Sequence, residues 1–392
     1  MYEELKQKFQ ATFQRPARYV FSAPGRTELS GNHTDHQLGI VLAGAVNLDT
    51  VAAVAPNGES TIRVLSEGYP LCEIDLNALD IQPQEKGTTA ALIRGTAAGI
   101  AARGYAIPGF DAHVTSRVLA GSGLSSSAAF EVLLGTVISH LSGAGLDALT
   151  IARLGQYAEN VYFGKPCGLL DQAASSLGGA ITIDFADEEA PQVERLELDL
   201  TGFGYALCIV DSGADHADLT DEYAAIPGEL KRICAHFGKT HLREVPEADF
   251  YAALPELRKE AGDRAVLRAI HIYEENRRVT EQVAALKRGD FDRFLELVKA
   301  SGRSSWMYLQ NVIPAGYTAH QDLAVALALA EKLLNGAGAC RVHGGGFAGT
   351  IQAFVPLGQL DAFRAGMDAV LGEGSCHVLS IRSAGGILLE EL

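Results

Sequence analysis

The chain has 392 residues, of which 47% are hydrophobic and 20% charged, and its formal net charge at pH 7 is −16. This length is sufficient for two domains, each with its own hydrophobic core. The negative charge argues against a nucleic-acid or anionic-membrane surface, which would need a basic patch. It leaves a nucleotide ligand open, because a few amides, a lysine or a metal ion can hold phosphate groups locally.

The first ten residues, M-Y-E-E-L-K-Q-K-F-Q, predict a charged amphipathic helix and not a signal peptide, which would need a basic start and an apolar segment. No apolar run reaches the length of a membrane span. The six cysteines lie far apart without a C-x-x-C pair, as is typical of buried thiols in a reducing compartment. A cytoplasmic protein is therefore expected.

A polar stretch interrupted by glycines follows the predicted helix 2–15 and the predicted strand 17–22. Residues 25–36 read G-R-T-E-L-S-G-N-H-T-D-H and precede an apolar strand at 40–46. This density of polar side chains beside a strand suits a binding loop on a rigid sheet. A solvated surface loop is the alternative, and one His and one Asp two residues apart do not define a metal site.

The second notable stretch, residues 119–131, reads L-A-G-S-G-L-S-S-S-A-A-F-E and leads into a predicted helix at 125–141. Glycines allow backbone N–H groups to turn inward, and the free N–H groups of a helix start carry partial positive charge, so this loop can cradle an anion. An ordinary Ser-capped helix is the alternative. Before this loop, the sequence predicts strands at 50–55, 60–66 and 71–76, with a hairpin turn at Asn57-Gly58. A helix at 88–102 and a strand at 109–116 follow.

A helix predicted at 147–163 carries Glu159, and Asp171 follows among apolar residues, where a carboxylate is either paired, functional or a helix cap. The acidic segment 184–200 suits a hairpin or a crossing between domains. Beyond it we predict a buried strand at 205–210 and helices at 218–237, 247–259, 262–288, 290–300 and 317–334.

The third glycine-rich stretch lies at 337–355, where four glycines fall within six residues, more than a hairpin turn requires. Close approach of this backbone to a ligand or to another loop explains them better. A helix at 357–371 and a strand at 377–381 complete a strand-helix-strand order that is typical of a ferredoxin-like layer.

Taken together, the three stretches resemble the GHMP kinases, and the first resembles the galactokinases among them. Galactokinases carry G-R-V-N-L-I-G-E-H-T-D-Y, which residues 25–36 match in part. The phosphate loop G-L-S-S-S-A is intact at 123–128, and the third motif G-G-G-F-G-G is G-G-G-F-A-G at 344–349. A-E-x-x-F-x-G-x-P-C-G-x-x-D-Q is matched at 158–172, so the similarity extends over nearly the whole chain.

The resemblance implies a two-domain fold of mixed α/β and α+β type, with an N-terminal GHMP kinase domain at 1–200 and a C-terminal, ferredoxin-like domain at 201–392. The active site would lie in the cleft between them. It implies ATP-dependent phosphorylation of the anomeric (C1) hydroxyl of galactose or a closely related sugar, giving sugar 1-phosphate and ADP, with Mg²⁺ as cofactor. The expected partners are the sugar and ATP, without nucleic acid or membrane; a monomer is expected, and other oligomeric states stay open.

Site residues carry over from the matched motifs. Asp171 would be the general base and Arg26 would offset charge, while Ser127 and Glu159 would hold Mg²⁺. The residues implied for the sugar are Asn32, His33, Asp35, Gly168 and Tyr223. Those implied for ATP are Gly121, Ser122, Gly123, Leu124, Ser125, Ser126, Ser127 and Ala128. The glycines of the third motif are Gly344, Gly345, Gly346 and Gly349.

Several positions depart from the galactokinase pattern. Asn32 replaces a Glu that faces the C6 hydroxyl in the family, His36 replaces a Tyr, and Glu28 replaces an Asn. Because an amide neither repels a carboxylate nor requires a hydroxyl, a kinase for galacturonate is an alternative. A non-catalytic, galactokinase-like sugar sensor is another, although the complete set of phosphate-loop serines, Arg26 and Asp171 favours catalysis.

Overall fold

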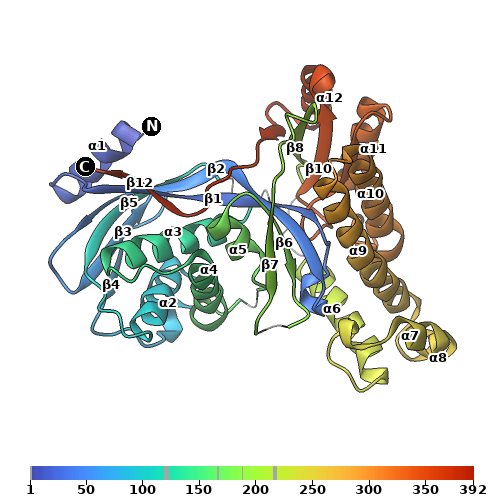
Figure 1. Ribbon diagram of the computed structural model, residues 1–392, viewed down its shortest axis with the longest axis horizontal. Coiled ribbons are helices and arrows are strands. Elements are labelled where there is room, and N and C mark those ends of the chain that lie inside the picture. Colours follow the sequence, from blue (N-terminus) through green and yellow to red (C-terminus); the bar gives the residue numbers. More distant parts are fainter. Residues whose placement is uncertain (1, 119–122, 166, 188, 215–218) are drawn as a thin grey trace.

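The computed structural model describes residues 2–118, 123–165, 167–187, 189–214 and 219–392, which form two β-sheets with helices packed on both (Figure 1). The larger sheet has eight strands in the order β12-β1-β2-β5-β3-β4, and β6 and β7 extend it from β2. Its strands are β1 (Tyr19–Ser30), β2 (Ile40–Pro56), β3 (Thr61–Ser66), β4 (Cys72–Asp75), β5 (Phe110–Ser116), β6 (Ala180–Asp184), β7 (Gln192–Leu196) and β12 (Ile387–Glu391).

Helices cover both faces of the long strands because successive side chains of a strand point to opposite faces. Ala52 and Val54 of β2 face the core beneath the sheet, whereas Val51 and Ala53 face the N-terminal helix. The helices beneath are α2 (Thr89–Ala101), α3 (Ser126–Leu141), α4 (Ala148–Tyr157) and α5 (Leu170–Leu177), and α1 (Tyr2–Phe13) lies on the other face (Figure 1).

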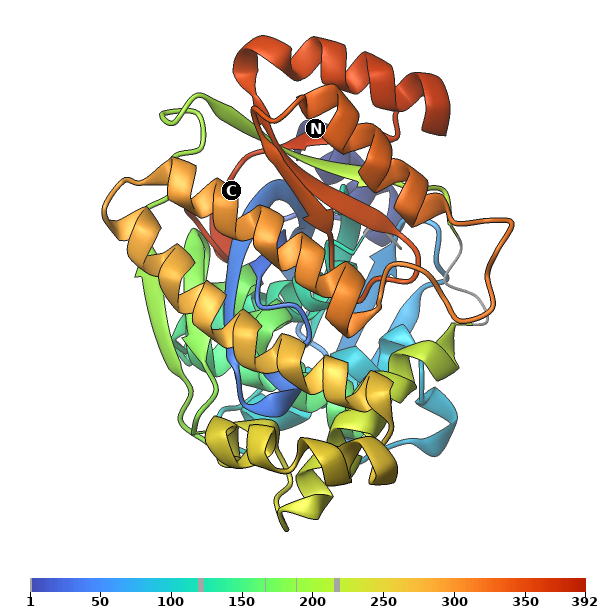
Figure 2. The same ribbon diagram turned by 90° about the vertical axis from the view of Figure 1, so that its right-hand side faces the viewer.

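The smaller sheet has the antiparallel order β11-β8-β10-β9. Its strands are β8 (Tyr205–Asp211), β9 (Ala339–Val342), β10 (Thr350–Pro356) and β11 (Cys376–Leu379). Helices α9 (Asp263–Lys287) and α10 (Phe291–Ser304) pack on one face, and α11 (Asp322–Leu334) and α12 (Leu360–Leu371) pack on the other (Figure 2). A further helical cluster contains α6 (Thr220–His236), α7 (Glu247–Ala252) and α8 (Leu254–Glu260).

One hydrophobic core joins the two sheets. It contains Leu29 and Leu42 of the larger sheet, Phe354 of the smaller sheet and Phe294 of α10. The loops that follow β1 and β9 therefore meet across this core. The described part of the chain contains no helix with both the length and the apolar composition of a membrane span.

The mixed α/β fold expected from the sequence is confirmed, but the predicted hairpin at Asn57-Gly58 is wrong. Strands β2 and β3 do not pair with each other, because β5 lies between them, antiparallel to β2 and parallel to β3. The predicted helix at 147–163 also changes: its α-helical part ends at Tyr157, and a wider π-helical turn covers Ala158–Phe163.

The chain ends in the larger sheet. Strand β12 pairs antiparallel with β1, with Ile387 opposite Ser22 and Glu391 opposite Tyr19. The predicted boundary after residue 200 falls between β7 and β8. The last residues of the segment assigned to the second domain thus lie in the sheet of the first.

Candidate active site

A cavity of about 910 Å³ lies between the loop that follows β1, the start of α5 and the loop that follows β9. Residues of the first and third glycine-rich stretches line it, and Ser125 of the second is hydrogen-bonded to Asp171 on its wall. Of the predicted site residues, those that line it are Arg26, Asn32, His33, Asp35, Gly168, Asp171, Gly344 and Gly345.

Arg26 and Asp171 form an ion pair on the wall of this cavity. Arg26 Nε lies 2.7 Å from Asp171 Oδ1, and Ser125 Oγ donates to Asp171 Oδ2 at 2.6 Å. The arginine is buried, whereas the aspartate side chain keeps 36% of its surface exposed. Burial acts to raise the pKa of Asp171, but the charge and hydrogen bond of Arg26 outweigh it, so that the pKa lies below its usual range. The carboxylate is thus ionised and reachable.

The described part of the phosphate loop is anchored on β1. The Arg26 guanidinium donates to the Gly123 carbonyl, and the Arg26 amide donates to Leu124 O at 3.0 Å. Ser125 has a left-handed backbone conformation (φ 58°), and α3 starts at Ser126, so that the first N–H groups of the helix follow the loop. Ala128 is buried in this helix. Gly121 and Ser122, predicted to bind ATP, lie outside the described residues.

Two buried glutamates lie behind this loop. Gln172 Nε2 donates to Glu131 Oε2 and to Glu159 Oε2, at 2.9 Å in both cases, and Lys165 Nζ lies 3.2 Å from Glu159 Oε1. Burial and the nearby charge of Glu159 raise the pKa of Glu131 to about 8. Oε1 of Glu131 and Oε1 of Gln172 have no hydrogen-bond partner among the described atoms.

The loop after β1 holds Asp35 against Gly168. A Cβ atom at position 168 would lie 2.9 Å from Asp35 Oδ2, so any larger residue there would push this carboxylate away. Burial raises the pKa of Asp35.

A chain of hydrogen bonds fixes the imidazole of His33. Gln37 Nε2 lies 3.3 Å from His36 Nδ1, His36 Nε2 lies 3.2 Å from His33 Nδ1, and His33 Nε2 lies 2.9 Å from the Gly345 carbonyl. Because the carbonyl only accepts, neutral rings satisfy the chain when Nε2 of each carries the proton. Burial lowers the pKa of His36 to about 3, which keeps that ring neutral.

Asn32 lies at the back of the cavity with a side chain that the protein itself engages. The residue is 0% exposed. Its Nδ2 donates to Glu28 Oε1 at 3.1 Å and to the Gly344 carbonyl at 2.5 Å. Its Oδ1 accepts from Asn311 Nδ2 at 2.8 Å and lies 3.4 Å from Ser305 Oγ.

The third motif approaches both this loop and α6. Tyr223 Oη donates to the Gly346 carbonyl at 2.7 Å, and a Cβ atom at position 345 would lie 2.8 Å from the Tyr223 ring. Tyr223 is not among the described residues that line the cavity. The Gly349 carbonyl accepts from both the amide and the hydroxyl of Ser212, so that this glycine is held beside the smaller sheet, just before β10.

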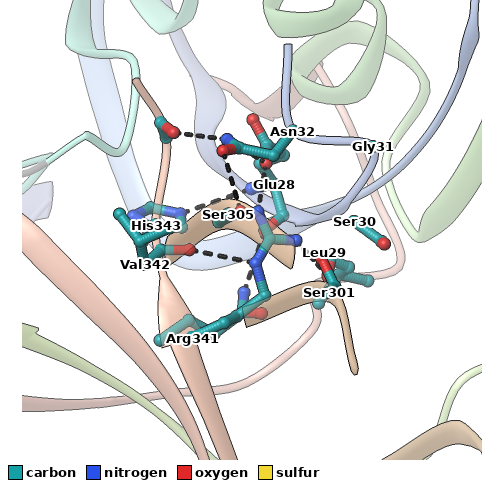
Figure 3. Close-up of polar contacts among 12 residues, drawn as sticks. Glu28, Leu29, Ser30, Gly31, Asn32, Ser301, Ser305, Arg341, Val342 and His343 are labelled. Atoms are coloured by element: carbon teal, nitrogen blue, oxygen red, sulfur yellow. Dashed lines mark hydrogen bonds and ion pairs between the residues drawn. The ribbon is translucent and has the colours of Figure 1, made fainter. Parts of the chain in front are cut away.

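Sequence reasoning gave no role to three polar groups of this site: Glu28, Arg341 and Asn311. From the sequence alone, Glu28 is only a departure from the galactokinase pattern. Arg341, wholly buried, pairs with Glu28 Oε1 at 2.6 Å (Figure 3). The run C-R-V in an apolar strand was the available signal, because a charged residue in such a strand needs a buried partner.

Comparison with known proteins agrees with this geometry. The family model described as galactokinase galactose-binding signature matches residues 7–56, and the GHMP kinase N-terminal domain matches residues 91–179. A galactokinase of Streptomyces coelicolor is 33% identical over 356 residues, which are 91% of this chain and 89% of that protein.

Solved structures share the fold. The Lactococcus lactis galactokinase complexed with galactose has a TM-score of 0.83 and 27% identity, with 99% of this chain and 100% of that chain covered. The mevalonate kinase of Methanococcus jannaschii has a TM-score of 0.66 at 14% identity, with 94% and 99% covered, and shows the common fold alone. The chain therefore belongs to the galactokinase family of GHMP kinases and is a sugar kinase.

Proposed function

We propose that the protein transfers the γ-phosphoryl group of ATP to the anomeric (C1) hydroxyl of galactose or a closely related sugar, giving sugar 1-phosphate and ADP. The observation that carries the proposal is the Arg26–Asp171 pair, which lies on the cavity wall within hydrogen-bond distance of the phosphate loop. The galactose bound to the Lactococcus lactis relative supports the sugar.

Asp171 acts as the general base in this proposal. Phosphoryl transfer depends mainly on positioning and on neutralising charge, so the base needs only to accept one proton from the attacking hydroxyl. Arg26 keeps Asp171 ionised, and it adds positive charge where the transferred group gathers negative charge. The loop at 123–128 and the start of α3 bind the ATP phosphates, together with Gly121 and Ser122.

The sugar is held by His33, Asp35 and Gly168, with Tyr223 supporting the pocket through the third motif. His33 is fixed by its bond to Gly345, and Asp35 accepts hydroxyl hydrogens beside Gly168. We further propose that residues 1–200 and 201–392 are the two domains that form this cleft. The six free cysteines suit the reducing cytoplasm as the compartment.

Mg²⁺ is assigned to Ser127 and Glu159. The described residues contain no group of three or more His, Cys, Asp or Glu side chains suited to a metal. The donors nevertheless fit, because Mg²⁺ takes one or two protein oxygens together with phosphate oxygens and water. The buried oxygens without partners on Glu131 and Gln172 add hard donors beside Glu159. Bound there, the ion would neutralise phosphate charge.

A coupled assay for ADP tests the reaction directly. The purified protein is supplied with ATP, Mg²⁺ and, in separate reactions, galactose, galacturonate, N-acetylgalactosamine or arabinose. We expect turnover with a galactose-configured sugar, and a phosphorus NMR spectrum of the product that shows the phosphate on C1. A protein that phosphorylates none of these sugars contradicts the proposal.

The base assignment has its own test. Asp171→Ala should lower kcat by at least about 100-fold, since positioned general bases contribute at least this factor, while ATP binding measured by calorimetry is retained. Asp147→Ala is the matched control, because that aspartate caps α4 and does not line the cavity. Unimpaired turnover of Asp171→Ala would exclude Asp171 as the base.

A further inference from the structure

Positions 28, in β1, and 32, in the loop that follows β1, hold a carboxylate and an amide in the reverse of the order in the galactokinase pattern. The structure brings the two side chains into contact, with Asn32 Nδ2 3.1 Å from Glu28 Oε1. Both line the cavity. Which of them is available to a ligand is decided by how many of its hydrogen-bonding groups the protein already uses.

Asn32 has no spare capacity as a donor. Each hydrogen of its Nδ2 is directed to a protein acceptor, Glu28 Oε1 or the Gly344 carbonyl, and its Oδ1 accepts from Asn311. A primary amide has only two N–H donors. A ligand that bonded to this amide would therefore have to break a buried contact between the loop and the third motif, which leaves polar groups unsatisfied.

Glu28 is different. Its Oε1 takes both the Asn32 amide and the Arg341 guanidinium, at 3.1 and 2.6 Å. Among the described residues, no hydrogen bond reaches its Oε2, and this atom is not one of the fully buried atoms without a partner. The side chain keeps 10% of its surface exposed. The remaining acceptor of an ion-paired carboxylate is thus open at the cavity.

Arg341 fixes this carboxylate in place. Its Nη2 holds Glu28 Oε1, its Nη1 donates to the Leu29 carbonyl at 3.1 Å and its Nε donates to Val342 O at 2.9 Å (Figure 3). The arginine is 0% exposed and comes from β9, in the smaller sheet. Glu28 is therefore rigid and negatively charged at a defined point of the cavity wall.

We propose that Glu28 is the specificity-determining residue of this site, and that its Oε2 accepts a hydrogen bond from a hydroxyl group of a neutral sugar. Asn32 is a positioning residue that makes no hydrogen bond to the sugar. This inference rests on the proposed sugar-kinase function. It assigns the substrate class to neutral galactose-like sugars. Uronic acids are disfavoured, because a second carboxylate would lie against the charge of Glu28.

The unmodified protein gives the first test. kcat/KM is measured for galactose and for galacturonate under the same conditions, and galactose should be preferred by about 100-fold or more, since a site built to bond a hydroxyl rejects a mismatched group strongly. Turnover of galacturonate that equals or exceeds that of galactose overturns the inference while the kinase function stands. Turnover of neither sugar overturns both.

Glu28→Gln, assayed with galactose and its deoxy derivatives, gives the second test. One deoxygalactose should lose about 10- to 100-fold in kcat/KM with the unmodified protein, as for a hydrogen bond to a charged group, and should lose much less with the variant. This cycle identifies the hydroxyl that Glu28 binds. The inference fails if every deoxy sugar loses as much kcat/KM with Glu28→Gln as with the unmodified protein. It also fails if the ratio of kcat/KM for galactose to that for galacturonate does not fall in the variant.

Arg341→Gln is the matched control, because it breaks the same ion pair and keeps the carboxylate of Glu28. It should lower the thermal stability while galactose is still preferred over galacturonate. If the preference instead disappears in Arg341→Gln and persists in Glu28→Gln, the carboxylate is not the determinant. Should Glu28→Gln fail to fold, turnover of galacturonate by the unmodified protein that equals or exceeds that of galactose still overturns the inference.

Discussion

At the scale of single residues, the proposed reaction depends on one carboxylate that is partly buried yet ionised. Asp171 receives Arg26 on one oxygen and Ser125 on the other. Burial alone would raise the pKa of Asp171, and Arg26 reverses the direction. In the proposed mechanism the arginine therefore has two effects that can be separated by experiment: it adds charge near the phosphates, and it sets the pH range in which the base works.

Replacing Arg26 by Met should shift the pH dependence of the reaction. With the arginine gone, burial dominates and the pKa of Asp171 rises, so the base becomes protonated at a higher pH than in the unmodified protein. The acid limb of the kcat/KM profile should move to higher pH and enter the range that an assay between about pH 4 and 8 covers. Arg15→Met, which removes an arginine paired with Asp111 outside the cavity, should leave the limb in place. An unmoved limb in Arg26→Met would contradict the coupling.

At the scale of elements, a single buried glutamate of α9 ties three segments together. Glu275 accepts from Ser30 Oγ and the Gly31 amide after β1, both at 3.2 Å, and from Ser301 Oγ of α10 at 2.6 Å. Arg278 lies 2.7 Å from its second oxygen. The loop that follows β1 is thus fixed to α9 and α10 by a carboxylate that does not line the cavity.

Glu275→Gln should destabilise the protein by about 3 kcal/mol near neutral pH, because it leaves Arg278 without its buried partner. Burial acts to raise the pKa of Glu275. The positive charge of Arg278 and other cations has the larger effect, and the pKa falls from 4.5 to about 2. Its contribution is therefore full above about pH 4.5 and is lost as the pH falls toward 2. Denaturant unfolding at several pH values should show the difference from the unmodified protein shrinking over this window. The partly exposed neighbour Glu274 pairs with Arg277 and lies 3.8 Å from Arg278 Nη1. Changed to Gln, it should cost far less, and equal losses would exclude the ion-pair explanation.

Helices and strands with a strong local sequence pattern were predictable, but the order in which strands pair in the sheet was not. Helices α3 and α9 start and end within one or two residues of the predicted bounds. The hairpin at Asn57-Gly58 failed because a turn motif is local, whereas the insertion of β5 between β2 and β3 depends on strands far along the chain.

In the candidate site too, the residues were predictable from motifs, whereas their contacts with distant residues were not. Motifs placed Arg26 and Asp171 on one cavity, and the structure brings them together. The saturation of Asn32 was not predictable, because its partner Asn311 lies 279 positions away and contact between them requires the assembled core. The amide at position 32 suggested a change of substrate. Because the donors of this amide are occupied by the protein and Glu28 Oε2 is not, we expect Glu28 to determine which sugar binds.

At the scale of the whole molecule, the two sheets are joined by a shared core and by the return of the chain end. The core that contains Leu29 and Phe354 belongs to both sheets. From the smaller sheet, the chain runs back to place β12 on the edge of β1, and Lys6 of α1 pairs with Glu390 of β12 at 2.6 Å. The C-terminal strand thus connects both sheets with the N-terminal helix.

Removing residues 387–392 should therefore destabilise the larger sheet while leaving the cavity intact. The deletion exposes the edge of β1 and removes Leu388 and Leu389, which pack on opposite faces of the sheet. The loss of apolar burial predicts a Tm lower by about 5 °C or more, and the unpaired edge predicts aggregation on heating. Deleting Leu392 alone, whose side chain is exposed, should change Tm much less. Since β12 does not line the cavity, KM for the sugar should be retained below the transition. An unchanged Tm in the longer deletion would mean that the larger sheet is stable without its last strand.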